Sequence, residues 1–186
     1  MNADDLAYVG FVWSEFFPKE VYLPQDPRLA GISMFRDFFL SDPIGQHYTN
    51  AQSLATQKYV YFDVNKLSEH LPFNDFDTSL RLRPVEVMGL VGIALCLVAK
   101  SHYPHCTEAF IIRPRFYNFS SEVSFGDIKS STVGQMLSVK GHVVRVSACH
   151  PLVESANFLC AKCMKYTSVR FEDGIFMPPN VCSTAK

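Results

Sequence analysis

Apolar positions follow a helical spacing in the first half of the chain. Residues 26–42 carry large apolar side chains three to four positions apart, which is the spacing of one helix face. Residues 59–64 are rich in β-forming side chains, and a helical pattern returns at 65–70. Residues 82–104 predict one longer helix with Pro84 in its first turn. This half therefore predicts a small, mostly helical bundle with one short strand.

Beyond the last of these helices the pattern changes to that of β-strands. Residues 108–121 are rich in β-branched and aromatic side chains, and residues 135–152 alternate between polar and apolar. Gly141 interrupts the alternation, as glycine does at a bulge or bend, and a bent long strand is what a small β-barrel uses to turn a corner. Residues 158–179 predict short strands, with a hairpin turn at 172–174.

Composition is that of a folded chain with one large or two small domains. The 186 residues are 48% hydrophobic and 19% charged, which excludes a mainly disordered or fibrous protein. The uncharged part of the longest apolar run, residues 87–99, is shorter than the roughly 20 residues that span a bilayer. We therefore predict a buried core helix and no membrane partner. Acidic residues stand at the N-terminus where a secretory signal has basic ones, so we expect an intracellular protein.

The two halves of the chain differ in charge. Residues 1–99 carry 7 Lys/Arg against 12 Asp/Glu, whereas residues 100–186 carry 10 against 6. The overall net charge of −1 argues against a generic nucleic-acid binder, but the asymmetry suggests two parts with different partners. We place the boundary between the parts near residues 103–109.

Three cysteines near the end of the chain have the spacing of metal ligands. Cys160 and Cys163 form a Cys-x-x-Cys pair, in which a tight turn directs both sulfur atoms at one ion. Cys182 follows after enough residues for a hairpin to return the chain to the same place. We predict a structural Zn²⁺ in a zinc ribbon, with three buried free cysteines as the alternative. A redox pair fits less well, because such pairs sit at helix N-termini and this one lies in strand-like sequence.

A structural zinc site takes four ligands, so one is missing from this set. Cys149 and His150, ten residues before Cys160, are the spare candidates inside the chain. The other place for a fourth ligand is just beyond Lys186.

Most of the chain, about residues 10–182, resembles a known family, and the resemblance is specific in residues 133–182. "VKGHVVRVS" is followed by Pro151 and then by the Cys160 pair, and "FEDGIFMPPNVC" leads to the third cysteine. This order is similar to the N-terminal region of the minichromosome maintenance (MCM) family of replicative and repair helicases. There, a strand reading roughly Val-(Arg/Lys)-Gly-x-Val-x-Arg-Val-Ser precedes a proline and a zinc ribbon. "RPRFYNF" at 113–119 resembles an element of the eighth paralogue of that family.

The resemblance implies an α+β fold with a defined order of domains. A helical MCM N-terminal subdomain at 1–108 would precede a partial oligonucleotide-binding (OB) fold β-barrel at 109–186. A zinc ribbon would be inserted into this barrel at about 153–186. The family pattern has its fourth cysteine a few residues after the third, just past Lys186, so the chain is expected to end inside the ribbon.

The OB fold implied by the resemblance makes several side chains candidates for DNA contacts. Such barrels line a groove with cations that track the phosphate backbone, and they stack bases on aromatic rings. The candidate cations are Lys129, Lys140, Arg145 and Arg115. The candidate rings, for which burial in a strand core is the alternative, are Phe116, Tyr117 and Phe119.

The resemblance also implies a function. It predicts the DNA-binding and ring-assembly portion of an MCM-like DNA helicase subunit that acts in homologous-recombination repair or meiosis in the nucleus. Expected partners are single-stranded and double-stranded DNA and other MCM subunits, the ninth paralogue among them, in a hexameric ring.

The sequence carries no ATPase motif of its own. A Gly-x-x-x-x-Gly-Lys-Ser/Thr phosphate loop does not occur in it, so we expect no catalytic activity from this chain alone. ATP and Mg²⁺ would belong to a downstream motor. A stand-alone zinc-ribbon adaptor for protein interaction is the alternative function, and a thiol oxidoreductase is the third.

Overall fold

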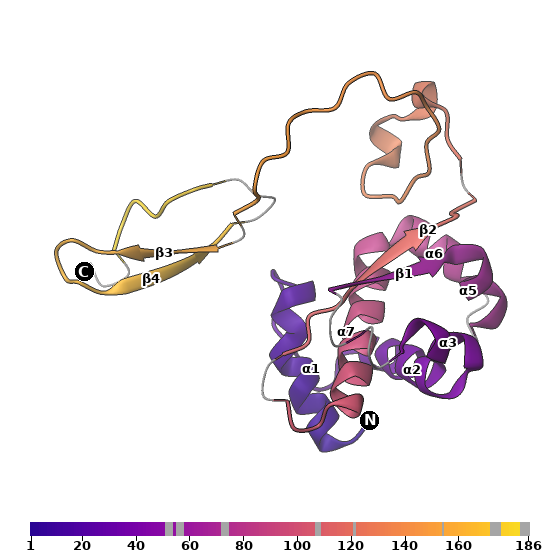
Figure 1. Ribbon diagram of the computed structural model, residues 1–186, viewed down its shortest axis with the longest axis horizontal. Coiled ribbons are helices and arrows are strands. Elements are labelled where there is room, and N and C mark those ends of the chain that lie inside the picture. Colours follow the sequence, from indigo (N-terminus) through magenta and orange to yellow (C-terminus); the bar gives the residue numbers. More distant parts are fainter. Residues whose placement is uncertain are drawn as a thin grey trace. The chain divides into compact units, whose positions relative to one another are not determined.

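The computed structural model in Figure 1 describes residues 1–50, 54, 58–71, 75–106, 109–120, 122–153, 155–171 and 176–182. The chain divides into two compact units, Met1–Gly141 and His142–Lys186. Residues 109–119 therefore pack with the helical part of the chain in this structure. The division at 1–108 and 109–186 concerns homologous domains and stays a prediction.

Helices form most of the first unit. The long ones are α1 (Ala3–Phe16), α2 (Arg28–Ser41) and α7 (Pro84–His102), and the short ones are α3 (Pro43–Tyr48), α5 (Val64–His70) and α6 (Phe76–Leu82). The helices predicted at 26–42, 65–70 and 82–104 are confirmed as α2, α5 and α7.

Short polar side chains begin several of these helices. The Asn2 side chain accepts a hydrogen bond from the Asp5 N–H while the Asp5 carboxylate accepts one from the Asn2 N–H, which is a capping box for α1. Asp42 and Asp63 cap α3 and α5 in a similar way, because their carboxylates accept from the first backbone N–H groups of each helix.

Two strands are described in the first unit besides these helices. β1 (Tyr59–Asp63) and β2 (Arg113–Tyr117) pair in parallel, with Tyr59 opposite Arg113 and Asp63 opposite Tyr117. The β-rich segments predicted at 59–64 and 108–121 are thereby confirmed as strands. Their pairing with each other joins a segment before α7 to a segment after it.

α7 is the core helix that the apolar run predicts. By length and composition it could cross a membrane, but 61% of its most apolar 18-residue window is buried inside the protein. Helices α1, α2 and α6 and strand β2 pack around it. This burial confirms the expectation of a core helix and explains the near-continuous apolar sequence, since a helix covered on most sides needs no polar face.

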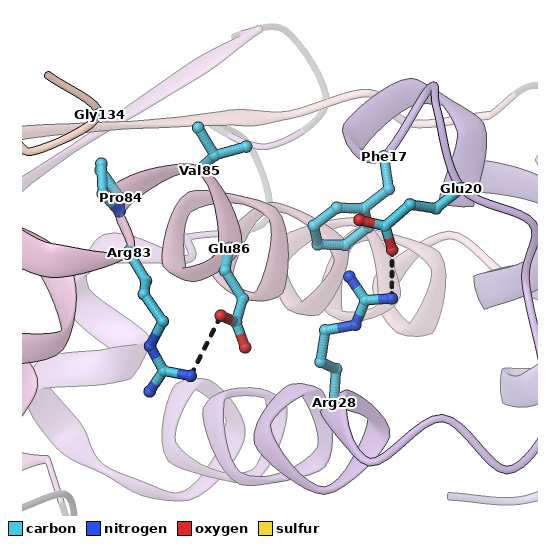
Figure 2. Close-up of a pocket in the computed structure, with 8 residues that line it drawn as sticks. All are labelled: Phe17, Glu20, Arg28, Arg83, Pro84, Val85, Glu86 and Gly134. Carbon is cyan, nitrogen blue, oxygen red and sulfur yellow. Dashed lines mark hydrogen bonds and ion pairs between the residues drawn. The ribbon is translucent and has the colours of Figure 1, made fainter.

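Arg28 joins the start of α2 to the end of α1. Its guanidinium lies 4.8 Å from the centroid of the Trp13 ring and 4.6 Å from that of Phe17, and it pairs with Glu20 and Asp26. Figure 2 shows the Arg28–Glu20 pair beside Phe17, in a pocket that also holds an ion pair between Arg83 and Glu86. The hydrogen bonds from Arg28 hold the pKa of the Asp26 carboxyl below its ordinary value.

The segment after β2 is largely irregular. Two short 3₁₀ turns, Phe125–Asp127 and Ser130–Thr132, and one isolated bridge between Glu122 and Ser138 are its described elements. The long bent strand predicted over 135–152 does not form in this structure.

The physical reason for this correction lies in the valines of the predicted strand. Val143, Val144 and Val146 are 83%, 95% and 80% exposed, and no described residue pairs with their backbone. Alternation predicts a strand only where a neighbouring strand satisfies its hydrogen bonds and covers its apolar face.

The described residues of the second unit form one hairpin. β3 (Ser155–Leu159) and β4 (Tyr166–Arg170) pair antiparallel, with Leu159 opposite Tyr166. Among the described residues, three aromatic rings pack together with centroids 4.9 to 6.4 Å apart: Phe158, Phe171 and Phe176. The short strands predicted after residue 158 are present as β4, while the turn predicted at 172–174 lies outside the described residues.

The Asp26–Arg28 contact gives a test of the first unit. Replacing Asp26 by Asn should lower the free energy of unfolding at pH 7 by on the order of 1–3 kcal/mol, because the side chain is only 9% exposed and its charged hydrogen bonds are lost. Since the folded-state pKa is lowered, this contribution is present above the ordinary pKa of 3.8 and is lost as the pH falls through the folded-state value.

Urea denaturation between pH 7 and pH 3 measures this difference. Asp37→Asn is the matched control, because that side chain is 63% exposed and should lose little. A difference between the Asp26 variant and the parent chain that stays constant across this pH range would contradict the ion-pair account.

Candidate metal centre

The Cys-x-x-Cys pair lies on the turn between β3 and β4. Cys160 follows β3 directly, and its N–H donates to the Lys165 carbonyl at 3.0 Å. The Met164 N–H donates to the Cys160 carbonyl at 2.9 Å, and Met164 takes a left-handed conformation with φ 55°. These bonds close a tight turn that holds both cysteines at one end of the hairpin.

The chain beyond β4 brings the third cysteine to the same place. Sγ of Cys163 lies 3.5 Å from Sγ of Cys182, and the sulfur atoms of all three cysteines lie within 4.8 Å of one another. The two sulfur atoms of a disulfide lie about 2.05 Å apart, so these cysteines are not joined by a disulfide. The structure thus brings together Cys160, Cys163 and Cys182, which the spacing in the sequence selects as one ligand set.

The arrangement fits a zinc ion. Zn–S bonds of about 2.3 Å place the sulfur atoms of a tetrahedral site roughly 3.8 Å apart, close to the spacing found here. Thiolates are soft ligands, which favour Zn²⁺ over Mg²⁺ or Ca²⁺. If Zn²⁺ is bound, these three cysteines would hold it, and its chemistry would be structural, because the ion would cross-link the turn to the chain after β4.

The cysteines and histidine outside this group do not join it. Cys149 and His150 are exposed, and neither belongs to the described group of converging donor atoms. Cys96 is buried in α7, where desolvation raises the pKa of its thiol to about 12, so it is an inert core residue. The fourth ligand therefore has no candidate among the residues that the structure describes.

The four predicted DNA-contacting cations are all exposed but lie on separate segments. Arg115 is on β2, Lys129 lies between the two 3₁₀ turns, and Lys140 is the last residue but one of the first unit. Arg145 belongs to the second unit. The contacts of these four cations with DNA stay a prediction.

The three aromatic residues weighed for base stacking divide between core and surface. Phe119 belongs to the core of the first unit, and the partly buried Phe116 packs against that core with its ring centroid 5.8 Å from that of Phe62. Tyr117 is 47% exposed. The core interpretation thus holds for the two phenylalanines, and only the tyrosine presents its ring to solvent.

Two surface aromatics were not selected from the sequence. Tyr59 and Tyr61 on β1 are exposed beside Arg115, whose guanidinium lies 4.8 Å from the centroid of the Tyr59 ring. The alternation in β1 indicates that these two tyrosines share a face. That the tyrosines lie beside Arg113 and Arg115 of β2 depends on the pairing of two strands 54 residues apart in the sequence, which no local pattern reveals.

Comparisons with known proteins agree with the resemblance noted above. A family model described as the MCM OB domain matches residues 124–186. Over 185 residues the chain is 28% identical to the probable DNA helicase MCM8 of Oryza sativa subsp. indica, and over 195 residues it is 25% identical to the DNA helicase MCM8 of Homo sapiens. The chain is homologous to the N-terminal region of MCM proteins.

The two relatives are much longer than this chain. The matches cover 98% and 91% of the chain but only 23% and 22% of the two relatives, so the chain spans less than a quarter of their length. Its fold is similar to the crystal structure of the N-terminal domain of an archaeal MCM, with a TM-score of 0.61 and 19% identity over 84% of this chain and 63% of that one. The expected α+β fold is therefore confirmed at this level.

The three-cysteine group gives a second test. The metal-free chain titrated with Co²⁺ should develop the absorption of thiolate-to-cobalt charge transfer, and Zn²⁺ should displace the cobalt. Replacing any one of Cys160, Cys163 or Cys182 by Ser should weaken Zn²⁺ binding at least about 50-fold, given roughly 10–16 kcal/mol for a complete site.

Cys149→Ser and His150→Ala are the matched controls and should leave the affinity unchanged. Equal effects at Cys149 and Cys163 would mean that the metal is not held by the group described here.

Proposed function

We propose that this chain is the DNA-binding and ring-assembly portion of an MCM8-like DNA helicase subunit. The observation that carries the proposal is the homology to MCM8 proteins over more than nine-tenths of the chain. The convergence of three thiols inside the segment that matches the MCM OB domain supports it, because a ribbon would need those residues close together.

The role assigned to the chain is binding, not hydrolysis. Its sequence contains no phosphate-loop motif, and it corresponds to less than a quarter of the MCM8 relatives. We assign ATP and Mg²⁺ to the part of such a protein that these residues do not include. The exposed cations Lys129, Lys140, Arg145 and Arg115 would contact phosphates and release the counterions that surround DNA.

Structural zinc is part of the proposal. The hairpin of the second unit has only three aromatic rings as its described cluster, and a core of this size contributes little free energy. Cross-linking by Cys160, Cys163 and Cys182 through Zn²⁺ would fix its shape.

The biological setting is proposed from the relatives. Proteins named MCM8 are helicases, so we propose a nuclear role in homologous-recombination repair or meiosis and assembly with other MCM subunits, including the ninth paralogue, in a hexameric ring. Both single-stranded and double-stranded DNA are proposed ligands of that ring.

One observation favours the adaptor alternative. The second unit exposes several large apolar side chains, which are typical of surfaces that meet another protein: Met164, Tyr166, Met177 and Val181. An adaptor would bind its partner mainly through these residues, and its affinity would depend little on salt.

Salt dependence separates the two functions. Fluorescence anisotropy with a labelled single-stranded oligo(dT) should give an affinity that falls linearly with salt on a double-logarithmic plot. The slope should become shallower by roughly 1.4 in Lys140→Ala/Arg145→Ala, because each lost phosphate contact contributes about 0.7 for single strands.

Lys66→Ala/Arg81→Ala removes the same charge from exposed positions on α5 and α6 and is the matched control. Its slope should equal that of the parent chain. Absence of DNA binding at low salt, together with salt-insensitive capture of a protein partner, would support the adaptor and overturn the helicase assignment.

A further inference from the structure

We propose that the solvent-facing side of the β1–β2 ribbon is a site for single-stranded DNA, with tyrosine rings that stack on bases and arginines that contact phosphates. This inference rests on the proposed function for the nature of its ligand. It differs in location, because it uses side chains of the helical unit that lie outside the segment matching the OB domain.

The parallel register places five side chains on one face of the ribbon. Tyr59 and Tyr61 alternate with buried Val60 and Phe62, so they point away from the core. Their partners across the ribbon are Arg113 and Arg115, and Tyr117 follows on the same face of β2. We call this set the tyrosine–arginine face; its members are Tyr59, Tyr61, Arg113, Arg115 and Tyr117.

Side-chain contacts agree with this division into two faces. The Arg115 guanidinium stacks over the Tyr59 ring at 4.8 Å, which joins the two strands on the outer side. On the inner side the centroid of the partly buried Phe116 ring lies 5.8 Å from that of Phe62, which is part of the core. The three tyrosines are 40%, 64% and 47% exposed, an unusual concentration of aromatic surface for two short strands.

The face is held on a rigid support. Phe62 and Ile112 are fully buried or nearly so, and β1 and β2 lie side by side in the helical unit (Figure 1). The Asn118 amide donates to the Asp63 carboxylate at 2.8 Å, which ties the ends of the two strands together. Because the ribbon is already ordered, stacking bases on it would cost little conformational entropy in the protein.

The charge of the face suits an anion. Arg115 and the neighbouring Lys58 are exposed cations, and Arg113 lies 4.0 Å from the Glu15 carboxylate. Asp63 stands two residues after Tyr61 and so belongs to the same side of β1. It is only 8% exposed, however, because its carboxylate caps α5 and accepts a hydrogen bond from the Asn118 amide. Its carboxylate is therefore held by the α5 N–H groups and by Asn118, and the charged members of the tyrosine–arginine face itself are both cations.

Spacing favours an extended single strand over a duplex. Side chains two residues apart in a strand lie roughly 6.6 Å apart, which is about twice the 3.4 Å per nucleotide of a duplex. Exposed rings at this spacing match bases that have separated from one another. Bases inside a duplex are covered by their neighbours and cannot stack on a protein ring, whereas aromatic rings beside cations are the usual platform for unpaired bases.

Photo-cross-linking of the unmodified chain tests the location. A single-stranded oligonucleotide carrying 5-iododeoxyuridine forms covalent adducts with aromatic side chains on which the base stacks, and peptide mass spectrometry identifies the residue. We expect adducts at Tyr59, Tyr61 or Tyr117. Adducts confined to residues 122–182 would overturn the inference and leave the proposed function standing. A chain that neither cross-links nor binds the oligonucleotide would overturn both.

Affinity measurements on variants test the mechanism. Tyr61→Ala and Tyr117→Ala should each weaken binding of single-stranded oligo(dT) at least about fivefold, whereas Tyr61→Phe keeps the ring and should retain the affinity. Tyr166→Ala, at an exposed tyrosine of the second unit, is the matched control and should have no effect. Circular dichroism establishes that each variant is folded.

Two further arms keep this inference separate from the proposed function. If the tyrosine variants bind normally while Lys140→Ala/Arg145→Ala loses affinity, the tyrosine–arginine face is not a DNA site although the chain binds DNA. A duplex of the same length should bind more weakly than the single strand at this face. Tighter binding of the duplex that is equally sensitive to Tyr61→Ala would overturn the stacking mechanism.

Discussion

Burial of α7 is the constraint on which the first unit depends. Eleven of its residues are buried, from Val87 to Ala99, so the helix must be covered by other elements along most of its length. Two glycines make this possible on the side of α1. A Cβ at Gly89 would lie 2.4 Å from the Phe17 ring, and one at Gly92 would lie 2.2 Å from the Phe16 ring. These rings fill the space of the missing side chains, which sets the separation of the two helices.

The β1–β2 ribbon owes its rigidity to the same core. Val60 and Phe62 on β1 and Ile112 before β2 are all part of the cluster that surrounds α7. Alternation then leaves the opposite side chains of both strands in solvent. The tyrosine–arginine face is thus a consequence of how the core of the first unit is covered.

The second unit is built differently. Its described residues form one hairpin, a cluster of three aromatic rings and a group of three thiols at the end of the hairpin. A unit this small buries too little apolar surface to offset its conformational entropy by burial alone. This difference explains why the spacing of the cysteines predicted a contact in this unit correctly, whereas the alternation of apolar residues at 135–152 did not.

The sequence by itself determined features that depend on near neighbours along the chain. Periodicity identified α2, α5 and α7, and the spacing of Cys160, Cys163 and Cys182 selected one ligand group, because a turn and a hairpin return are local geometry. Periodicity at 135–152 failed because a strand also needs a partner. Only the tertiary structure decided that β1 pairs with β2, since that contact joins distant segments through the burial of the helix between them. The exposure of Tyr59 and Tyr61 beside Arg115 follows from that pairing and from nothing nearer in the chain.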